Sequence, residues 1–143
     1  MLYTKKPQKF SPKFSVVSCF IENKGEFLLL RRQDEKPEGN TWGMPAGKIE
    51  QGENLLEAVI REIKEETSLV IEKPKLKYFK ELFVRYPNYD FVYHIFSTNF
   101  NKRPKVIIND KEHKKYYWFK PEEALLIEGI EDLDKCIEIF YSL

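Results

Sequence analysis

Short apolar runs bounded by turn residues dominate the start of the chain and predict β-strands. FSVVSCFI at residues 14–21 predicts a buried strand. EFLLLRR at residues 26–32 predicts the returning strand of a hairpin, because ENKG between the two runs supplies turn residues.

The second half of the chain is also strand-like, because it is rich in aromatic and β-branched residues. KLKYFKELFVRY and DFVYHIFSTNF flank Pro87-Asn88, a combination that predicts a long antiparallel hairpin. KVIIN at residues 105–109 and YYWFK at residues 116–120 predict two more short strands. Pro74 limits a further extended segment, LVIEK.

Three segments have the apolar spacing or the start signal of a helix. Residues 53–67 predict a helix whose apolar face is formed by Leu56, Val59, Ile60 and Ile63. PEEALLIEG begins with a proline, which favours a helix start. Residues 130–143 predict an amphipathic C-terminal helix with apolar positions 130, 133, 137 and 140.

This order of elements predicts an α+β fold packed in layers, with most strands antiparallel. A chain of 143 residues suits a single core, so we expect one domain over residues 1–143. Residues 1–12 are basic and contain two prolines, and we expect them to form an irregular N-terminal arm.

Composition bears on partners and compartment. Lys and Arg total 24 and Asp and Glu total 23, so no net charge attracts nucleic-acid polymers or anionic membranes. The start of the chain has no apolar signal segment, and no apolar run approaches membrane-spanning length, so we expect a cytoplasmic protein. Cys19 and Cys136 lie in apolar stretches, which predicts buried free thiols; a disulfide between them stays open.

The predicted helix at residues 53–67 ends in REIKEET, where Glu62, Glu65 and Glu66 share one face. Like charges four residues apart destabilise a helix, and carboxylates near its C-terminus oppose its dipole. A hard divalent cation would remove this repulsion, since Mg²⁺ prefers carboxylate oxygens and shares its other positions with phosphate. The glycine-rich loop TWGMPAGKIEQGE precedes the helix. The pattern predicts a metal–phosphate site, with a solvated acidic face as the alternative.

The spacing around these glutamates resembles the Nudix box, G-x5-E-x7-R-E-U-x-E-E-x-G-U, in which U is an aliphatic residue. The matching charged and glycine positions are Gly47, Glu53, Arg61, Glu62, Glu65 and Glu66. Ser68 replaces the late glycine of the box, and Ala46 stands where the family often has a second glycine. The resemblance is strongest over residues 41–69. It implies an α/β/α sandwich with a mixed, largely antiparallel sheet, a box helix and a C-terminal helix.

The resemblance also implies an activity. Nudix hydrolases cleave a phosphoanhydride bond of a nucleoside diphosphate linked to a further group, with water attacking phosphorus. The implied cofactor is Mg²⁺, with Mn²⁺ as a substitute, and the implied partner is a small nucleotide. A nucleoside triphosphate is the first expected substrate; nucleotide sugars and dinucleoside polyphosphates are the alternatives. Family members are often dimers, so a homodimer is also expected.

Residue roles follow from the matched positions of the box. Glu62, Glu65, Glu66 and the carbonyl of Gly47 match metal ligands. Arg61 and Glu53 match an ion pair that supports the catalytic helix. The general base is either Glu62 or a glutamate from a later loop. Glu112 is the best candidate for the later loop. His113 beside it is a candidate for substrate contact, and its alternative role is exposed polar surface.

Three residues are candidates for substrate contact. Arg32 ends a predicted strand and matches a position where the family often has arginine, although Arg31 is equal to it by chemistry. Tyr86 and Tyr89 lie near the predicted hairpin tip, where an aromatic ring could stack on a nucleobase. Their alternative role is in the core, because aromatic residues at strand spacing usually pack inside.

Two other functions suit the same fold. An isomerase acting on isopentenyl diphosphate would need a catalytic cysteine in the glycine-rich loop, and this chain has none there. A non-catalytic nucleotide-binding module would be expected to lose carboxylates of the metal site, and this chain keeps all of them.

Overall fold

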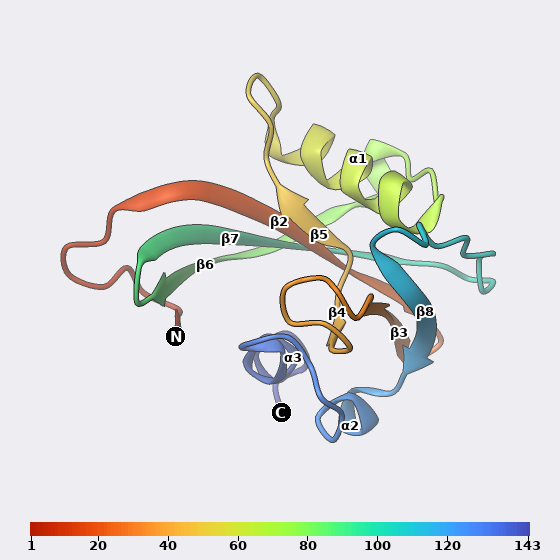
Figure 1. The fold of residues 1–143 in the computed structure, drawn as a ribbon. Helices are drawn as coiled ribbons and strands as arrows, with labels where there is room; N and C mark the ends of the chain where they lie inside the picture. Colours follow the sequence, from red (N-terminus) through yellow and green to blue (C-terminus); the bar gives the residue numbers. More distant parts are fainter.

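The computed structural model describes residues 1–143, and it contains one eight-stranded mixed sheet with helices on both faces (Figure 1). The strands are β1 (Leu2–Tyr3), β2 (Pro12–Asn23), β3 (Glu26–Arg32), β4 (Trp42–Gly43), β5 (Ala46–Lys48), β6 (Lys77–Tyr86), β7 (Tyr89–Asn99) and β8 (His113–Phe119). The helices are α1 (Leu55–Thr67), α2 (Pro121–Ala124) and α3 (Leu133–Tyr141), with a 3-10 turn η1 (Lys73–Lys75). The predicted layered fold is confirmed.

The strand order is β1-β6-β7-β2-β3-β4, with β5 paired to β2 and β8 paired to β3. All pairs of named strands are antiparallel except β2 and β7, which run parallel along most of their length. The expected β2–β3 hairpin is short, with only Glu22↔Phe27 and Asn23↔Glu26 in register. β2 pairs over Val16–Ser18 with β5, so β3 diverges from it and pairs with β8 instead.

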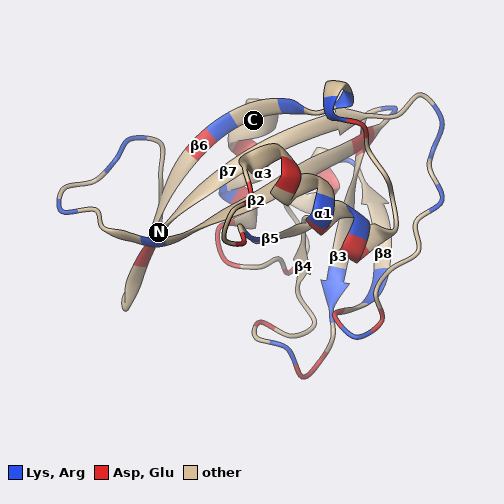
Figure 2. Cartoon of the chain, turned by 90° about the horizontal axis from the view of Figure 1, so that it is seen from above, with Lys and Arg blue, Asp and Glu red and all other residues tan.

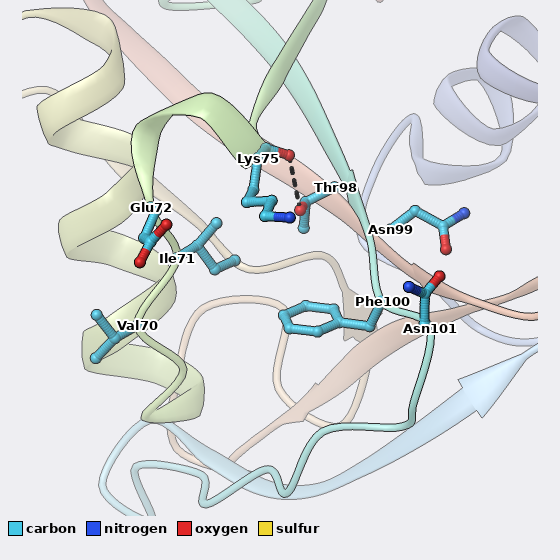
Figure 3. Close-up of a pocket in the computed structure, with 8 residues that line it drawn as sticks. All are labelled: Val70, Ile71, Glu72, Lys75, Thr98, Asn99, Phe100 and Asn101. Atoms are coloured by element: carbon cyan, nitrogen blue, oxygen red, sulfur yellow. Dashed lines mark hydrogen bonds between the residues drawn. The ribbon is translucent and has the colours of Figure 1, made fainter.

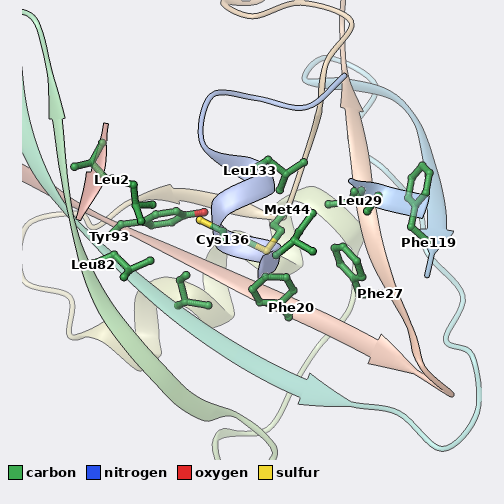
Figure 4. Close-up of a cluster of buried hydrophobic side chains, with 14 of the residues drawn as sticks. Leu2, Phe20, Phe27, Leu29, Met44, Leu82, Tyr93, Phe119, Leu133 and Cys136 are labelled. Atoms are coloured by element: carbon green, nitrogen blue, oxygen red, sulfur yellow. The ribbon is translucent and has the colours of Figure 1, made fainter. Parts of the chain in front are cut away.

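Alternating side chains of the central strands feed two separate cores, as the period of two along a strand requires. Val17, Cys19 and Ile21 belong to the core beneath α1, which also contains Ile63. Phe20 belongs to the core beneath α3, where it packs with Phe27, Leu29 and Cys136 (Figure 4). Both cysteines are buried and free, which confirms the prediction of unpaired thiols.

α1 begins with a capping box and packs one face on the sheet. Asn54 caps the first turn by accepting a hydrogen bond from the backbone N–H of Glu57, whose side chain returns a hydrogen bond from the Asn54 N–H. The helix buries Val59 and Ile63 against the sheet. Its C-terminal end therefore lies at a defined place beside β5 and the start of β8 (Figure 1).

Three local predictions were wrong. Residues 105–109 form no strand; they cross the end of α1, where the Ile107 N–H donates to the carbonyl of Thr67 and Val106 is buried. The segment LVIEK forms no strand either, and η1 overlaps its last residue. The N-terminal arm is not wholly irregular, because Leu2 is buried and pairs with Val84 as part of β1.

No helix is long and apolar enough to span a bilayer.

Candidate active site

The glutamates of α1 line a pocket of about 280 Å³. Residues from α1, β3, β5 and the segment entering β8 meet there. The lining residues are Arg32, Ala46, Glu62, Glu65, Glu66, Asn109, Glu112 and His113. The fold thus brings the three predicted metal-binding glutamates together with Arg32 and Glu112, which are distant from them in sequence.

Gly47 lies in close contact with the side chain of Glu62. A Cβ atom at position 47 would collide with the carboxyl group of Glu62, which lies directly over the glycine. The backbone of Gly47 is paired with Val17 of β2 and cannot move away freely. The glycine is therefore needed for close approach, which places its backbone beside the glutamate predicted to bind the same metal.

Arg61 is the centre of an ion-pair network on α1, where Figure 2 shows acidic and basic positions side by side. Its Nε and Nη2 donate to the two carboxylate oxygens of Glu53 at 2.6 and 2.9 Å. Nη1 lies 2.7 Å from Glu62 Oε1 and 3.3 Å from Glu65 Oε2. Nη2 also donates to the carbonyl of Lys48 at 3.1 Å. Arg61 therefore ties the glycine-rich loop to two of the pocket glutamates.

The Arg61 contacts also set the charge state of Glu53. Hydrogen bonds from Arg61, and then from the backbone of Glu50, lower the pKa of Glu53 to about 2. The predicted supporting ion pair between Arg61 and Glu53 is therefore present and ionised at neutral pH. A bidentate arginine–carboxylate pair fixes geometry as well as charge.

Glu66 is the most buried carboxylate of the pocket, with a side-chain exposure of 10%. Its Oε2 accepts the backbone N–H of Ala46 at 3.1 Å. Burial raises the pKa of Glu66 well above its usual value, and the neighbouring Glu62 carboxyl raises it further. Burial also raises the pKa of Glu62, against the opposing effect of Arg61. Two largely buried carboxyl groups thus lie close together, and Arg61 is the only cation paired with either of them.

This donor set fits a hard divalent cation. Carboxylate oxygens are the ligands that Mg²⁺ and Mn²⁺ accept, and a cation between Glu62 and Glu66 would relieve their repulsion. Glu65 is half exposed and turned toward Arg61, and no three acidic or imidazole groups already form a compact metal cluster. The side chain of Glu65 would therefore have to turn away from Arg61 to join the other two at a shared ion.

Glu112 and His113 both reach the pocket. Glu112 pairs with Lys36 at 3.3 Å, which holds it at the rim. The alternative role of His113 as exposed polar surface was wrong: only 5% of the residue is accessible, because it pairs with Arg32 at the start of β8 and lies under the end of α1. Its Nε2 is 3.7 Å from Glu66 Oε1. Burial, and then the charge of Arg32, lower the pKa of His113 to about 4, so the ring is neutral at pH 7.

The structure separates the two arginines that the sequence left as equal candidates. Arg32 lines the glutamate pocket. Arg31 instead donates from Nε to the carbonyl of Asn40 at 2.8 Å and lies over the ring of Trp42 at 5.8 Å. The register of β3 against β8 shifts between Arg31 and Arg32, so the contacts of each side chain, and not regular alternation along the strand, separate the two.

Tyr86 and Tyr89 are not brought into this pocket. Their rings meet edge to face across the end of the β6–β7 hairpin, with centroids 5.6 Å apart. They line a separate groove of about 460 Å³ that also includes Lys9 and Lys13. A substrate contact from either tyrosine would have to come from a part of the ligand far from the phosphate.

Ser68 stands where the box has a glycine, and the structure accommodates the serine at this position. Ser68 follows α1 in the left-handed conformation, with φ 65° and ψ 10°, as expected for the residue that replaces the late glycine. Its N–H donates to the carbonyl of Lys64, and its hydroxyl donates to the carbonyl of Ile107 at 2.9 Å. The serine therefore gains a contact that glycine could not make.

Two residues near the pocket were missed from the sequence, Asn109 and Lys36. Asn109 lines the pocket from the loop before β8, and Lys36 holds Glu112. The only sequence signal for Asn109 is its turn chemistry beside Asp110, because its side chain accepts from the backbone N–H of Lys111.

A third hollow, of about 320 Å³, lies between the segment that follows α1 and the end of β7 (Figure 3). It is larger than the glutamate pocket, yet its only carboxylate is Glu72. Within it, the Thr98 hydroxyl donates to the carbonyl of Lys75 at 2.9 Å. Cavity size alone therefore does not identify the active site, whereas the concentration of crowded carboxylates does.

Comparisons with known proteins identify the family of the chain. The family model described as the NUDIX domain matches residues 12–139. The uncharacterized Nudix hydrolase YvcI of Bacillus subtilis is 40% identical over 62 residues, which cover 43% of this chain and 37% of that protein. The ADP-ribose pyrophosphatase of Methanocaldococcus jannaschii is 43% identical over 61 residues, covering 43% of this chain and 34% of that protein. The chain thus spans little more than a third of either relative.

A solved structure extends the similarity to the whole fold. The MutT protein from Methanosarcina mazei Go1 superposes with a TM-score of 0.79 at 26% identity, covering 95% of this chain and 97% of that protein. The residues matched by the family model include the glycine-rich loop, α1 and the segment entering β8. The chain belongs to the NUDIX domain family.

Proposed function

We propose that this protein is a divalent-metal-dependent Nudix hydrolase that cleaves a phosphoanhydride bond of a nucleoside diphosphate derivative. The observation that carries the proposal is the crowding of Glu62 and Glu66 in one pocket with Arg32. Buried carboxyl groups with raised pKa values that line a cleft are candidates for a functional site. Mg²⁺ is the proposed metal, and Mn²⁺ is the substitute.

Each pocket residue has its own proposed role. A cation held by Glu62, Glu65, Glu66 and the Gly47 carbonyl would polarise the phosphate and neutralise its developing charge. Arg61 orients Glu62 and Glu65 through the contacts described above. Arg32 binds a phosphate oxygen through its guanidinium group. The P–O bond of the anhydride breaks as the oxygen of an attacking water forms a bond to phosphorus.

The general base takes a proton from that water. Glu62 and Glu112 are the two candidates, and both line the pocket. Glu112 is held by Lys36 at 3.3 Å, and it would have to leave this lysine to reach the water. Glu62 is already held beside Gly47, but it is also a proposed metal ligand. We place Glu112 first, because a base that is not bound to metal can accept the proton directly.

A nucleoside triphosphate is the first proposed substrate. ADP-ribose is a close second, because one relative is an ADP-ribose pyrophosphatase. Nucleotide sugars and dinucleoside polyphosphates follow. The proposal also includes a cytoplasmic location, which the two free buried thiols support, and a homodimer.

The test is release of phosphate or pyrophosphate from a panel of nucleotides, with and without Mg²⁺. Wild type and Glu66→Gln are compared in parallel. Metal-dependent turnover that disappears in Glu66→Gln supports the proposal, and the best substrate identifies the cleaved bond. Equal turnover by the two proteins would overturn the assignment of this pocket.

A further inference from the structure

The glutamate pocket contains a second group of side chains that the box does not include. Asn109 and His113 line it together with Arg32. Arg32 comes from β3, His113 from the start of β8 and Asn109 from the loop before it, and β8 begins beside the C-terminal end of α1 (Figure 1). The pocket thus combines acceptors from α1 with hydrogen-bond donors from the sheet.

Asn109 is oriented by its own loop. Its Oδ1 accepts the backbone N–H of Lys111 at 3.1 Å, so its Nδ2 is the end of the amide that remains for a ligand. The Asn109 carbonyl accepts the N–H groups of Glu112 and His113 at 3.0 and 2.9 Å. The loop is therefore held in place before any ligand binds.

His113 is buried without a hydrogen bond to its ring. Only 5% of the residue is exposed, and its Nδ1 has no partner. Its Nε2 approaches Glu66 Oε1 only to 3.7 Å, which is beyond hydrogen-bond distance. Nδ1 is itself buried, so Nε2 is the ring nitrogen that a ligand in the pocket would reach, and an imidazole without a hydrogen bond favours a ligand that supplies one.

The ring position is fixed from outside the pocket. Gln33 Nε2 donates to the carbonyls of Asp110 and His113 at 2.6 and 3.3 Å, and the Gln33 N–H donates to the carbonyl of Glu112 at 3.0 Å. Lys36 Nζ pairs at 3.3 Å with Oε1 of Glu112, the one acidic side chain that lines this side of the pocket. Arg32 Nε donates to the carbonyl of Pro37 at 2.7 Å, so the Asn109 amide, the His113 imidazole and the two terminal nitrogens of Arg32 remain for a ligand rich in acceptors.

We propose that Asn109 and His113 are substrate-binding residues that, together with Arg32, bind the non-bridging oxygens of one phosphate group. A phosphate group offers several acceptors and carries the charge that Arg32 complements. The proposal rests on the hydrolase function proposed above and adds the residues that recognise the phosphate. It assigns the two walls of the pocket different tasks, with α1 facing the cation and the sheet side facing the anion.

Asn109→Asp is the variant that tests the proposed phosphate contact most directly. The new carboxylate can still accept from the Lys111 N–H, so the loop keeps its turn, while the donor facing the pocket becomes an acceptor. We expect affinity for inorganic pyrophosphate, measured by calorimetry with Mg²⁺ present, to fall about tenfold or more. We expect KM on the best nucleotide to rise by a similar factor. Unchanged affinity and KM would overturn the proposal.

His113 can be observed directly, because the chain has only two histidines. His94 is the natural control: it is buried on β7, where its Nδ1 bonds the hydroxyl of Tyr78, and it does not line the pocket. Pyrophosphate with Mg²⁺ should shift the ring ¹⁵N signals of His113 and leave those of His94 in place. A titration in which pyrophosphate binds and the His113 ring signals stay unchanged would exclude its role in binding.

Variants of the two histidines complete the test. His113→Phe keeps a planar ring without nitrogen and should raise KM and the pyrophosphate Kd, whereas His94→Phe should change neither. A wild type that turns over nucleotides while Asn109→Asp and His113→Phe retain wild-type KM supports the hydrolase and overturns the phosphate site. A wild type that binds pyrophosphate at these residues without turnover supports the phosphate site and contradicts the hydrolase.

Discussion

The carboxyl group of Glu62 occupies the space in which a side chain at Gly47 would lie. The two residues come from α1 and β5, and their contact joins the helix that carries the glutamates to the loop that precedes it. The position of Glu62 therefore depends on the absence of one methyl group. This relationship gives the first prediction.

Gly47→Ala should displace Glu62 and reduce kcat about a hundredfold, because small misplacements of catalytic groups have effects of that order. Steady-state kinetics on the best substrate measures it. Gly25→Ala is the control, since a Cβ at Gly25 meets nothing but its φ of 81° is strained. That control should lose about 1 kcal/mol of stability and keep kcat. Full activity in Gly47→Ala would show that Glu62 tolerates another position.

Glu66→Gln should reduce hydrolysis about a hundredfold or more, as the loss of one electrostatic stabiliser does in other enzymes. In metal-free protein the same variant should raise the melting temperature near pH 8, because it removes the repulsion with Glu62. Scanning calorimetry in a chelator, with and without added Mg²⁺, measures this. A variant that Mg²⁺ stabilises as strongly as wild type would show that Glu66 is not a ligand.

The raised pKa values of Glu62 and Glu66 set the sign of the pH dependence. A carboxyl group whose pKa is higher in the folded state stabilises the fold below its unfolded pKa. This stabilisation is lost as pH rises through the folded pKa. Metal-free wild type should therefore lose stability as pH rises above about 4.5, relative to Glu66→Gln at each pH. Saturating Mg²⁺ should reduce this difference, and parallel pH profiles of the two proteins would contradict the assignment.

Arg61→Lys should lower kcat more than it changes KM. Lysine keeps the charge but cannot donate in parallel to both oxygens of Glu53 and still reach Glu62. We expect about a tenfold loss of kcat with a nearly unchanged melting temperature, because the glutamates lose their orientation while the core is untouched. Arg103→Lys is the matched control. Arg103 pairs with Glu26 and does not line the glutamate pocket, so this variant should retain kcat.

Ser68→Gly should leave both activity and stability nearly unchanged, which revises the stability gain that the left-handed conformation alone would suggest. Glycine relieves about 1 kcal/mol of strain, yet the hydroxyl contact with the Ile107 carbonyl is worth a similar amount. Ser142→Gly is the control, because Ser142 also follows a helix at φ 56°. It has no such side-chain contact and should gain up to about 1 kcal/mol in denaturant unfolding.

The local elements could be predicted because short-range physics decides them. α1 is specified by its cap at Asn54 and by apolar residues at helical spacing, and the β6–β7 hairpin by the turn at Pro87-Asn88. The crowding of Glu62, Glu65 and Glu66 is also visible in the sequence, since helical spacing places them on one face. These local features alone were enough to predict the fold class and the position of the carboxylate site.

The tertiary structure decided what lies opposite those glutamates. The parallel pairing of β2 with β7, and the departure of β3 toward β8, depend on contacts between distant segments that no local pattern encodes. Those pairings bury His113, set Asn109 beside the pocket and choose Arg32 over Arg31. Burial and charge state are properties of the assembled fold, because a side chain's solvent access and neighbours exist only after distant strands have met.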